Sequence, residues 1–114
     1  MKIIDGFLLR YQKDVVRTLP KATQRENILM AAIGLSEEAG EAAGLVKKWA
    51  WQGHDLDRDK VIEEVGDDLF YAALLLLSIG SSLEYALLKN MEKRRKRYPD
   101  GFDPERSKNR EGKG

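Results

Sequence analysis

The sequence predicts an all-α protein of four helices packed as a bundle. Apolar residues recur at steps of three and four along most of the chain, and capping and turn residues separate these periodic segments. No stretch shows the sustained alternation or the Val, Ile and Thr enrichment of β-strands. At 114 residues the chain is expected to form one domain, whose small core alone would give modest stability.

The first helix is expected at residues 2–17, before the break at Pro20. Its apolar side chains recur at helical spacing: Ile3, Ile4, Phe7, Leu8, Tyr11 and Val15. A second helix is expected to begin after Thr23, because Thr23 and Glu26 have the spacing of a capping box. It should end near Trp51, where Gly53 follows.

The third helix is expected at residues 58–79 and contains a run, residues 69–77, that is apolar on all sides. Such a helix is normally buried all round. Four short helices cannot enclose so long a run, so we predict a homodimer or homotetramer. After Gly80 the fourth helix should continue to about Arg97. We therefore take residues 1–102 as the domain and residues 103–114 as a polar tail, mobile unless a ligand or partner orders it.

The charges are unevenly distributed although the net charge is only +1. Residues 1–25 carry six basic and two acidic residues, residues 26–88 four and twelve, and residues 89–114 ten and five. The small net charge argues against a general nucleic-acid binder, whereas an acidic middle between basic ends suits a site for a metal and phosphates. Cysteine is absent, which excludes disulfides and thiolate chemistry. Without a signal-peptide pattern or a membrane-length apolar run, we expect a cytoplasmic protein that does not bind membranes.

Two acidic clusters occupy otherwise apolar helical segments: Glu37, Glu38 and Glu41, then Glu63, Glu64, Asp67 and Asp68. Within each cluster the residues are three or four apart, which places carboxylates on one helix face. If the second and third helices pack antiparallel, Glu38 and Glu41 would meet Glu64 and Asp67 in a cage of four carboxylates. Oxygen ligands of this kind hold Mg²⁺ together with substrate phosphates. The alternative interpretation is two solvated acidic faces.

Other residues bear on which metal and which ligand such a site would bind. A ferritin-like di-iron centre needs Glu-x-x-His steps, and the only histidine, His54, lies in a turn. Asn90, Lys93 and Arg97 share one face of the fourth helix and could hold phosphates, although a basic run is also typical of a solvated face. Lys60 could bind phosphate or pair with Glu64. Trp51 could stack on a nucleobase or pack in the core.

The two acidic motifs together resemble those of the MazG-like, all-α nucleoside triphosphate pyrophosphohydrolases. The family's EExxE and ExxD pattern is matched by Leu35-Ser36-Glu37-Glu38-Ala39-Gly40-Glu41 and Glu63-Glu64-Val65-Gly66-Asp67. A closing segment also matches, Asn90-x-x-Lys93-x-x-x-Arg97-Tyr98-Pro99-Asp100-Gly101-Phe102. The resemblance covers about residues 30–103 and is closest to small single-domain members, although Glu37 stands where many close relatives have Gly.

The resemblance implies the four-helix MazG fold and hydrolysis of a nucleoside triphosphate between the α- and β-phosphates, giving monophosphate and pyrophosphate. It implies Mg²⁺, with Mn²⁺ as a substitute, held by Glu38, Glu41, Glu64 and Asp67, with Glu37 as a further catalytic residue. The expected substrate-binding residues are Lys60, Asn90, Lys93, Arg97, Tyr98 and Trp51. Two alternatives are a non-catalytic nucleotide-binding or dimerising adaptor and a phosphoribosyl-ATP pyrophosphohydrolase.

Overall fold

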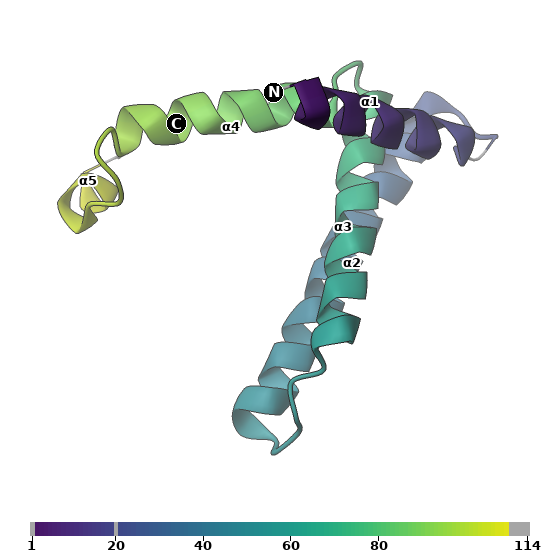
Figure 1. Ribbon diagram of the computed structural model, residues 1–114. Coiled ribbons are helices and arrows are strands. Elements are labelled where there is room, and N and C mark those ends of the chain that lie inside the picture. The colour runs from purple at the N-terminus through teal and green to yellow at the C-terminus, as the bar shows by residue number, and fades with distance from the viewer. Residues whose placement is uncertain (1, 20, 110–114) are drawn as a thin grey trace. The chain divides into compact units, whose positions relative to one another are not determined.

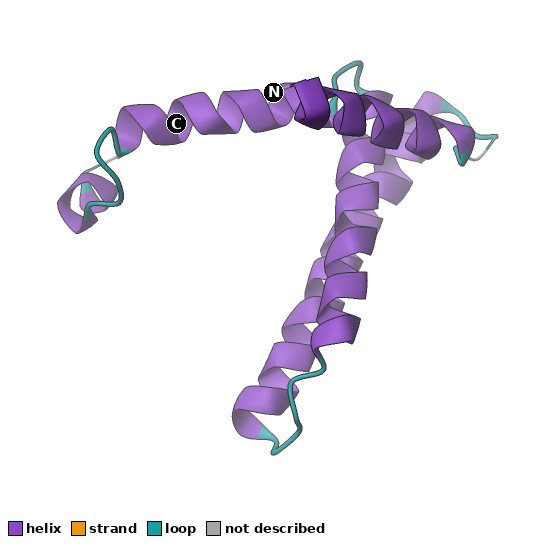
Figure 2. Cartoon of the chain, viewed as in Figure 1, coloured by secondary structure: helices purple, strands orange, loops and turns teal. Residues whose placement is uncertain are grey.

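The structure is a computed structural model that describes residues 2–19 and 21–109, with side chains from residue 6 onward. The all-α prediction is confirmed, because the described residues form helices and loops and no strand (Figure 2). There are five described helices: α1 Lys2–Arg17, α2 Gln24–Trp51, α3 Arg58–Ser78, α4 Leu83–Arg97 and α5 Pro104–Lys108. The chain divides into two compact units, Met1–Leu83 and Glu84–Gly114.

Local signals set the ends of α2. At its start the Thr23 hydroxyl accepts a hydrogen bond from the Glu26 N–H at 3.1 Å, and the Glu26 carboxylate accepts one from the Thr23 N–H at 3.0 Å. This is the predicted capping box, which satisfies two N–H groups that the helix cannot pair. At the other end the Gln52 N–H donates to the Lys48 carbonyl, and Gly53 adopts a φ of +74°. That left-handed conformation costs glycine little, so the chain can turn back there.

The first unit is built on the α2–α3 hairpin. The Asp57 carboxylate caps α3 by accepting a hydrogen bond from the Lys60 N–H, and α3 then runs back alongside α2 (Figure 1). A small core of fully buried side chains joins the three helices of this unit: Val15 from α1, Ala31 from α2, and Ala73 and Leu74 from α3. Because this core ties α2 to α3, it fixes which residues of the two helices face each other.

Close packing of α2 on α3 is seen at Gly34. A Cβ atom at this position would lie 2.6 Å from ring atoms of Tyr71, which is far inside contact distance. The ring therefore lies directly on the glycine backbone. Tyr71 is one helical turn beyond Asp67 on α3, so this contact sets the spacing between the helices next to the acidic residues.

The apolar run at residues 69–77 is only partly enclosed within one chain. Ala73 and Leu74 are buried, but Leu69 is 48% exposed and Leu75, Leu76 and Leu77 are half-buried. Among the described residues no single helix is long and apolar enough to span a membrane, although α3 and α4 taken together pass the same length and composition test as a bent pair.

The second unit contains most of α4, a turn and α5. The Asp103 carboxylate caps α5 by accepting a hydrogen bond from the Glu105 N–H at 2.9 Å, and Pro104 occupies the first turn. The Arg106 guanidinium donates to the Arg97 carbonyl at 3.5 Å, which joins α5 to the end of α4. The predicted count of four helices was therefore one too low, because α5 lies in the segment for which we expected a tail. Residues 110–114 of that segment lie outside the described residues.

Candidate metal centre and basic segment

Carboxylates from α2 and α3 meet in the middle of the hairpin. Glu38 and Glu41, three residues apart on α2, face Glu64 on α3, and one oxygen of each lies within 4.8 Å of the others. A second group on α3 consists of Glu63, Glu64 and Asp67, with the same separation. Glu64 belongs to both groups. The structure thus brings together three of the four residues expected to bind metal and places Asp67 beside the third.

Burial makes this cluster unlike an ordinary acidic surface. Glu64 is only 4% exposed, and Glu38 is half-buried, whereas Glu41 is exposed. The Oε2 atoms of Glu38 and Glu64 are buried and receive no hydrogen bond from any donor when both carboxylates are ionised. Buried carboxylate oxygens normally have partners, because their desolvation is otherwise uncompensated. A proton or another cation between them would remove this deficit.

Crowding of like charges changes the acidity of the cluster. Contact with the Glu64 carboxylate, together with burial and the charges of Glu41 and Asp67, raises the pKa of Glu38 to about 7. Glu64 also raises the pKa of Glu41. Hydrogen bonds from these two carboxyl groups and the nearby Lys60 lower the pKa of Glu64. Without metal, Glu38 is therefore protonated in about half of the molecules near pH 7, and Glu64 stays ionised.

Lys60 is the basic residue at the cluster. Its ammonium lies 3.5 Å from Glu64 Oε1 and 3.7 Å from Glu63 Oε2, so the pairing with Glu64, one of the two alternatives left open, is present. The charge of Glu63 and the contact with Glu64 raise the pKa of Lys60. Lys60 lies on α3 three and four residues before these partners, which is the spacing of ion pairs along one helix face.

The donor set suits a hard divalent cation. The two groups offer only carboxylate oxygens, with no histidine or cysteine, and two of the residues have buried oxygens without donors. Mg²⁺ and Mn²⁺ prefer such ligands and leave coordination positions for water and phosphate. The residues present therefore fit the expected ion, and Glu38, Glu41, Glu64 and Asp67 are the ones that would hold it.

Glu37, Asp68 and Tyr11 are three further residues that lie near the acidic cluster. Glu37 is exposed and outside both groups, and it acts on them through its charge, which helps to raise the pKa of Glu41. Asp68, four residues after Glu64, is half-buried with Oδ1 unpartnered, and only its spacing hinted at this position. Tyr11 on α1 is half-buried against the core, and burial followed by the charges of Asp14 and Asp67 raises its pKa. Nothing in its sequence context indicated that Asp67 would lie near it.

The expected phosphate-binding residues of α4 belong to the second unit. Asn90 accepts a hydrogen bond from Arg94 at 2.9 Å, Lys93 is exposed, and Arg97 is half-buried with its Nε lacking a partner. The Tyr98 ring packs against Phe102 at a centroid distance of 5.3 Å. Trp51, in the first unit, is 82% exposed at the end of α2, so it is not a core residue of this chain.

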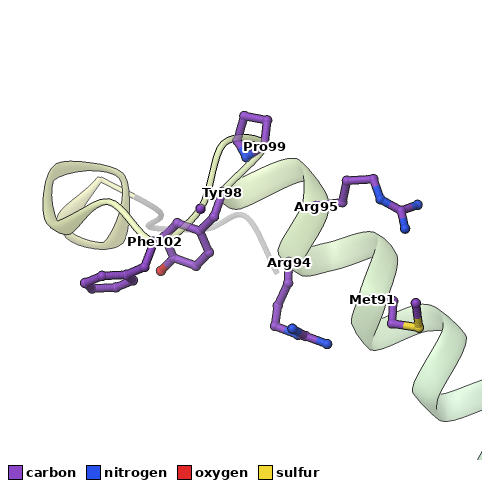
Figure 3. A pocket seen from close by; sticks show the side chains of 7 residues that line it. Met91, Arg94, Arg95, Tyr98, Pro99 and Phe102 are labelled. Atoms are coloured by element: carbon purple, nitrogen blue, oxygen red, sulfur yellow. The ribbon is translucent and has the colours of Figure 1, made fainter.

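A pocket of about 550 Å³ lies at the end of α4, within the size range of ligand sites. Figure 3 shows the Tyr98 and Phe102 rings next to each other beyond the helix, with Arg94 and Arg95 extending from α4. Two arginines and two aromatic rings are among the residues that line the pocket, which are Met91, Arg94, Arg95, Tyr98, Pro99, Gly101 and Phe102. Of the residues expected to bind substrate, only Tyr98 lines it.

The chain matches one known protein family. The family model described as "MazG nucleotide pyrophosphohydrolase domain" matches residues 24–102, which include all of α2, α3 and α4. No curated protein and no solved structure matches the chain. Because the family match covers more than half of the sequence, the chain belongs to the MazG family, as the motif resemblance indicated.

Proposed function

From membership of the MazG family we propose that the protein is a Mg²⁺-dependent nucleoside triphosphate pyrophosphohydrolase. The reaction would cleave a ribo- or deoxyribonucleoside triphosphate between the α- and β-phosphates, giving the monophosphate and pyrophosphate. The observation that carries the proposal is the meeting of Glu38, Glu41 and Glu64, in which the buried Oε2 atoms of Glu38 and Glu64 have no hydrogen-bond donor. We also propose the cytoplasm as the setting and maintenance of the nucleotide pool as the role, since nucleoside triphosphates are made and used there.

The residues of the acidic cluster have distinct roles in the proposed reaction. A divalent ion would supply charge neutralisation on the phosphates and activation of a water molecule. Glu38, Glu41, Glu64 and Asp67 would hold the ion, and loss of the Glu38 proton would prepare the site for it. Glu37, exposed beside Glu41, is our candidate for orienting the attacking water.

Basic residues would hold the rest of the substrate. Lys93 and Arg97 would bind the β- and γ-phosphates and stabilise the leaving pyrophosphate, because guanidinium and ammonium groups form strong charge-assisted hydrogen bonds with phosphate. Asn90 shares this helix face. Tyr98 and the exposed Trp51 offer rings on which a base could stack.

Product analysis tests the proposal. The protein is incubated with Mg²⁺ and a panel of canonical, deoxy and oxidised triphosphates and phosphoribosyl-ATP, and pyrophosphate and orthophosphate are measured separately. We expect pyrophosphate as the first product from at least one nucleoside triphosphate. Orthophosphate as the first product would contradict α,β cleavage, turnover of phosphoribosyl-ATP alone would favour that enzyme class, and no turnover at all would favour the adaptor.

We further propose that a second copy of the chain covers the exposed apolar face of α3, giving a homodimer or homotetramer. Ile62, Val65 and Leu69 are 66%, 45% and 48% exposed, and their spacing places them on one helix face. A contiguous exposed apolar face of this kind marks an interaction surface, and a twofold axis lets one face bind its own copy. Sedimentation analysis should show at least a dimer that Leu69→Asp weakens. A monomeric wild-type protein would contradict the proposal.

A further inference from the structure

Lys60 occupies the place where the acidic cluster most needs positive charge. Its ammonium contacts Glu64 Oε1 at 3.5 Å and Glu63 Oε2 at 3.7 Å, so it joins residues of both carboxylate groups. Its charge also reaches Glu41 on α2, where it lowers the carboxyl pKa against the effect of the other acids. One lysine therefore offsets repulsion among carboxylates from two helices.

This contact involves an oxygen of the residue that both groups share. Glu64 is 4% exposed, with Oε1 next to Lys60 and Oε2 without a donor. A divalent ion bound by Glu64 would lie within a few ångströms of the ammonium. Two cations at that separation repel each other in a partly buried site, so binding of the ion weakens the contact between Lys60 and Glu64.

Lys60 is able to move away because its side chain is 47% exposed. The four-carbon stem of a lysine is flexible, so its ammonium group can move into solvent readily. We propose that Lys60 is a built-in counter-ion that holds the carboxylate cluster together before metal binds. The arriving ion displaces the ammonium from Glu64, and the freed ammonium becomes available to an oxygen of the metal-bound triphosphate. This inference rests on the proposed function, because it assigns metal and polyphosphate to the same site.

The proposal predicts competition between Lys60 and the metal. In Lys60→Met the stem length is kept and the ammonium is removed, so Mg²⁺ has no charge to displace. Calorimetric titration of Mg²⁺ into the full chain without nucleotide should show binding about 1.5- to fivefold tighter than in the wild type, the range expected for a partly exposed ion pair. The metal-free melting temperature of Lys60→Met should fall, and saturating Mg²⁺ should close most of that gap.

Arg58→Met is the matched control. It removes the same charge from the same helix two residues earlier, and Arg58 has no ion-pair partner among the described residues. We expect its Mg²⁺ affinity and its melting temperature to stay close to those of the wild type. If both variants tighten Mg²⁺ binding equally, the effect is general electrostatics and the proposal is overturned.

The outcomes separate this inference from the proposed function. One outcome is that the wild type binds Mg²⁺ in a way that Glu64→Gln abolishes, while Lys60→Met binds Mg²⁺ with the same or lower affinity. That result overturns the counter-ion role of Lys60 and leaves the proposed metal site standing. Absence of Mg²⁺ binding by the wild type overturns both. Tighter binding by Lys60→Met alone supports the counter-ion role.

Discussion

The acidic cluster and the basic segment of α4 carry opposite charges, and their charged residues are arranged in different ways. The cluster gathers carboxylates from two helices around a buried Glu64, and the Oε2 atoms of Glu38 and Glu64 lack a hydrogen-bond donor. The basic segment consists of five consecutive residues, 93–97, at the end of one helix, and the last four lie in its final turn, where positive charge also complements the helix dipole. All but Arg97 are exposed. The cluster thus encloses like charges in a partly buried site, whereas the basic segment leaves most of its charges in solvent.

The largest effect is expected from breaking the cluster at its shared residue. Glu64→Gln removes a charge that both carboxylate groups use, so Mg²⁺ affinity and pyrophosphate release should fall by at least roughly 100-fold, more than loss of a residue that only supports a ligand. Calorimetry and product analysis measure the two losses. Asp59→Asn, an exposed change on the same helix, is the control, and equal effects from the two variants would contradict the central role of Glu64.

The second effect concerns the packing that brings the cluster together. Gly34→Ala forces its new Cβ against the Tyr71 ring, and overpacking of this kind costs about 1–3 kcal/mol of unfolding free energy. Gly44→Ala lies on the same helix with open space around its Cβ, and it should stabilise by up to about 1 kcal/mol. Denaturant unfolding measures both. Equal stability of the two variants would show that the contact with Tyr71 does not limit the approach of α2 and α3.

A third, smaller effect tests the basic segment. Arg97→Ala should raise KM for the triphosphate about tenfold by removing a charge-assisted phosphate contact. Because the metal site lies on other helices, Mg²⁺ affinity measured without nucleotide should not change. Lys96→Ala, outside the predicted phosphate-binding face, serves as the control. Loss of metal binding in Arg97→Ala, or an equal rise in KM in the control, would contradict the proposed division of roles.

The smallest effect is a dependence on pH. Because the pKa of Glu38 is raised to about 7 and metal replaces its proton, Mg²⁺ should bind about threefold more tightly at pH 7.5 than at pH 6.5. Glu38→Gln should remove this dependence along with much of the affinity. An unchanged affinity of the wild type across this range would show that no proton leaves when the metal enters.

The same shift predicts how stability varies with pH when metal is absent. A pKa raised on folding means that the folded state favours the protonated carboxyl group. The stability contributed by Glu38 is present below pH 4.5, its ordinary pKa, and is lost as pH rises through about 7. The metal-free melting temperature should therefore fall between pH 5 and 8, and Mg²⁺ should restore it at pH 8. A rise over this range without metal would contradict the assignment.

Local signals were enough to predict most of the helices. The Thr23 capping box and the turn at Gly53 act within a few residues, so the bounds of α2 could be predicted from them. The same is true of α5 in retrospect, because Asp103 and Pro104 are an ordinary helix start. The polar composition after residue 102 led us to expect a tail without structure. Such a composition indicates few core contacts, but it does not exclude a short capped helix.

The site could be predicted only in part. Helical spacing and a short connection were sufficient to expect Glu38 and Glu41 opposite Glu64. The position of Lys60 was left open between phosphate and carboxylate, because the choice depends on which partner is present. The nearness of Tyr11 to Asp67 depends on how α1 packs against α3, and no local pattern encodes a tertiary contact of that kind.

The most direct measurement is the position of a bound divalent ion. Crystals grown with Mn²⁺ give anomalous scattering that locates the ion without assumptions about the reaction. We expect a peak within coordination distance of carboxylate oxygens of Glu38, Glu41, Glu64 and Asp67, with the Lys60 ammonium moved away from Glu64. A peak elsewhere, or an acidic cluster that stays free of Mn²⁺ at saturating concentration, would show that these carboxylates do not form a metal site.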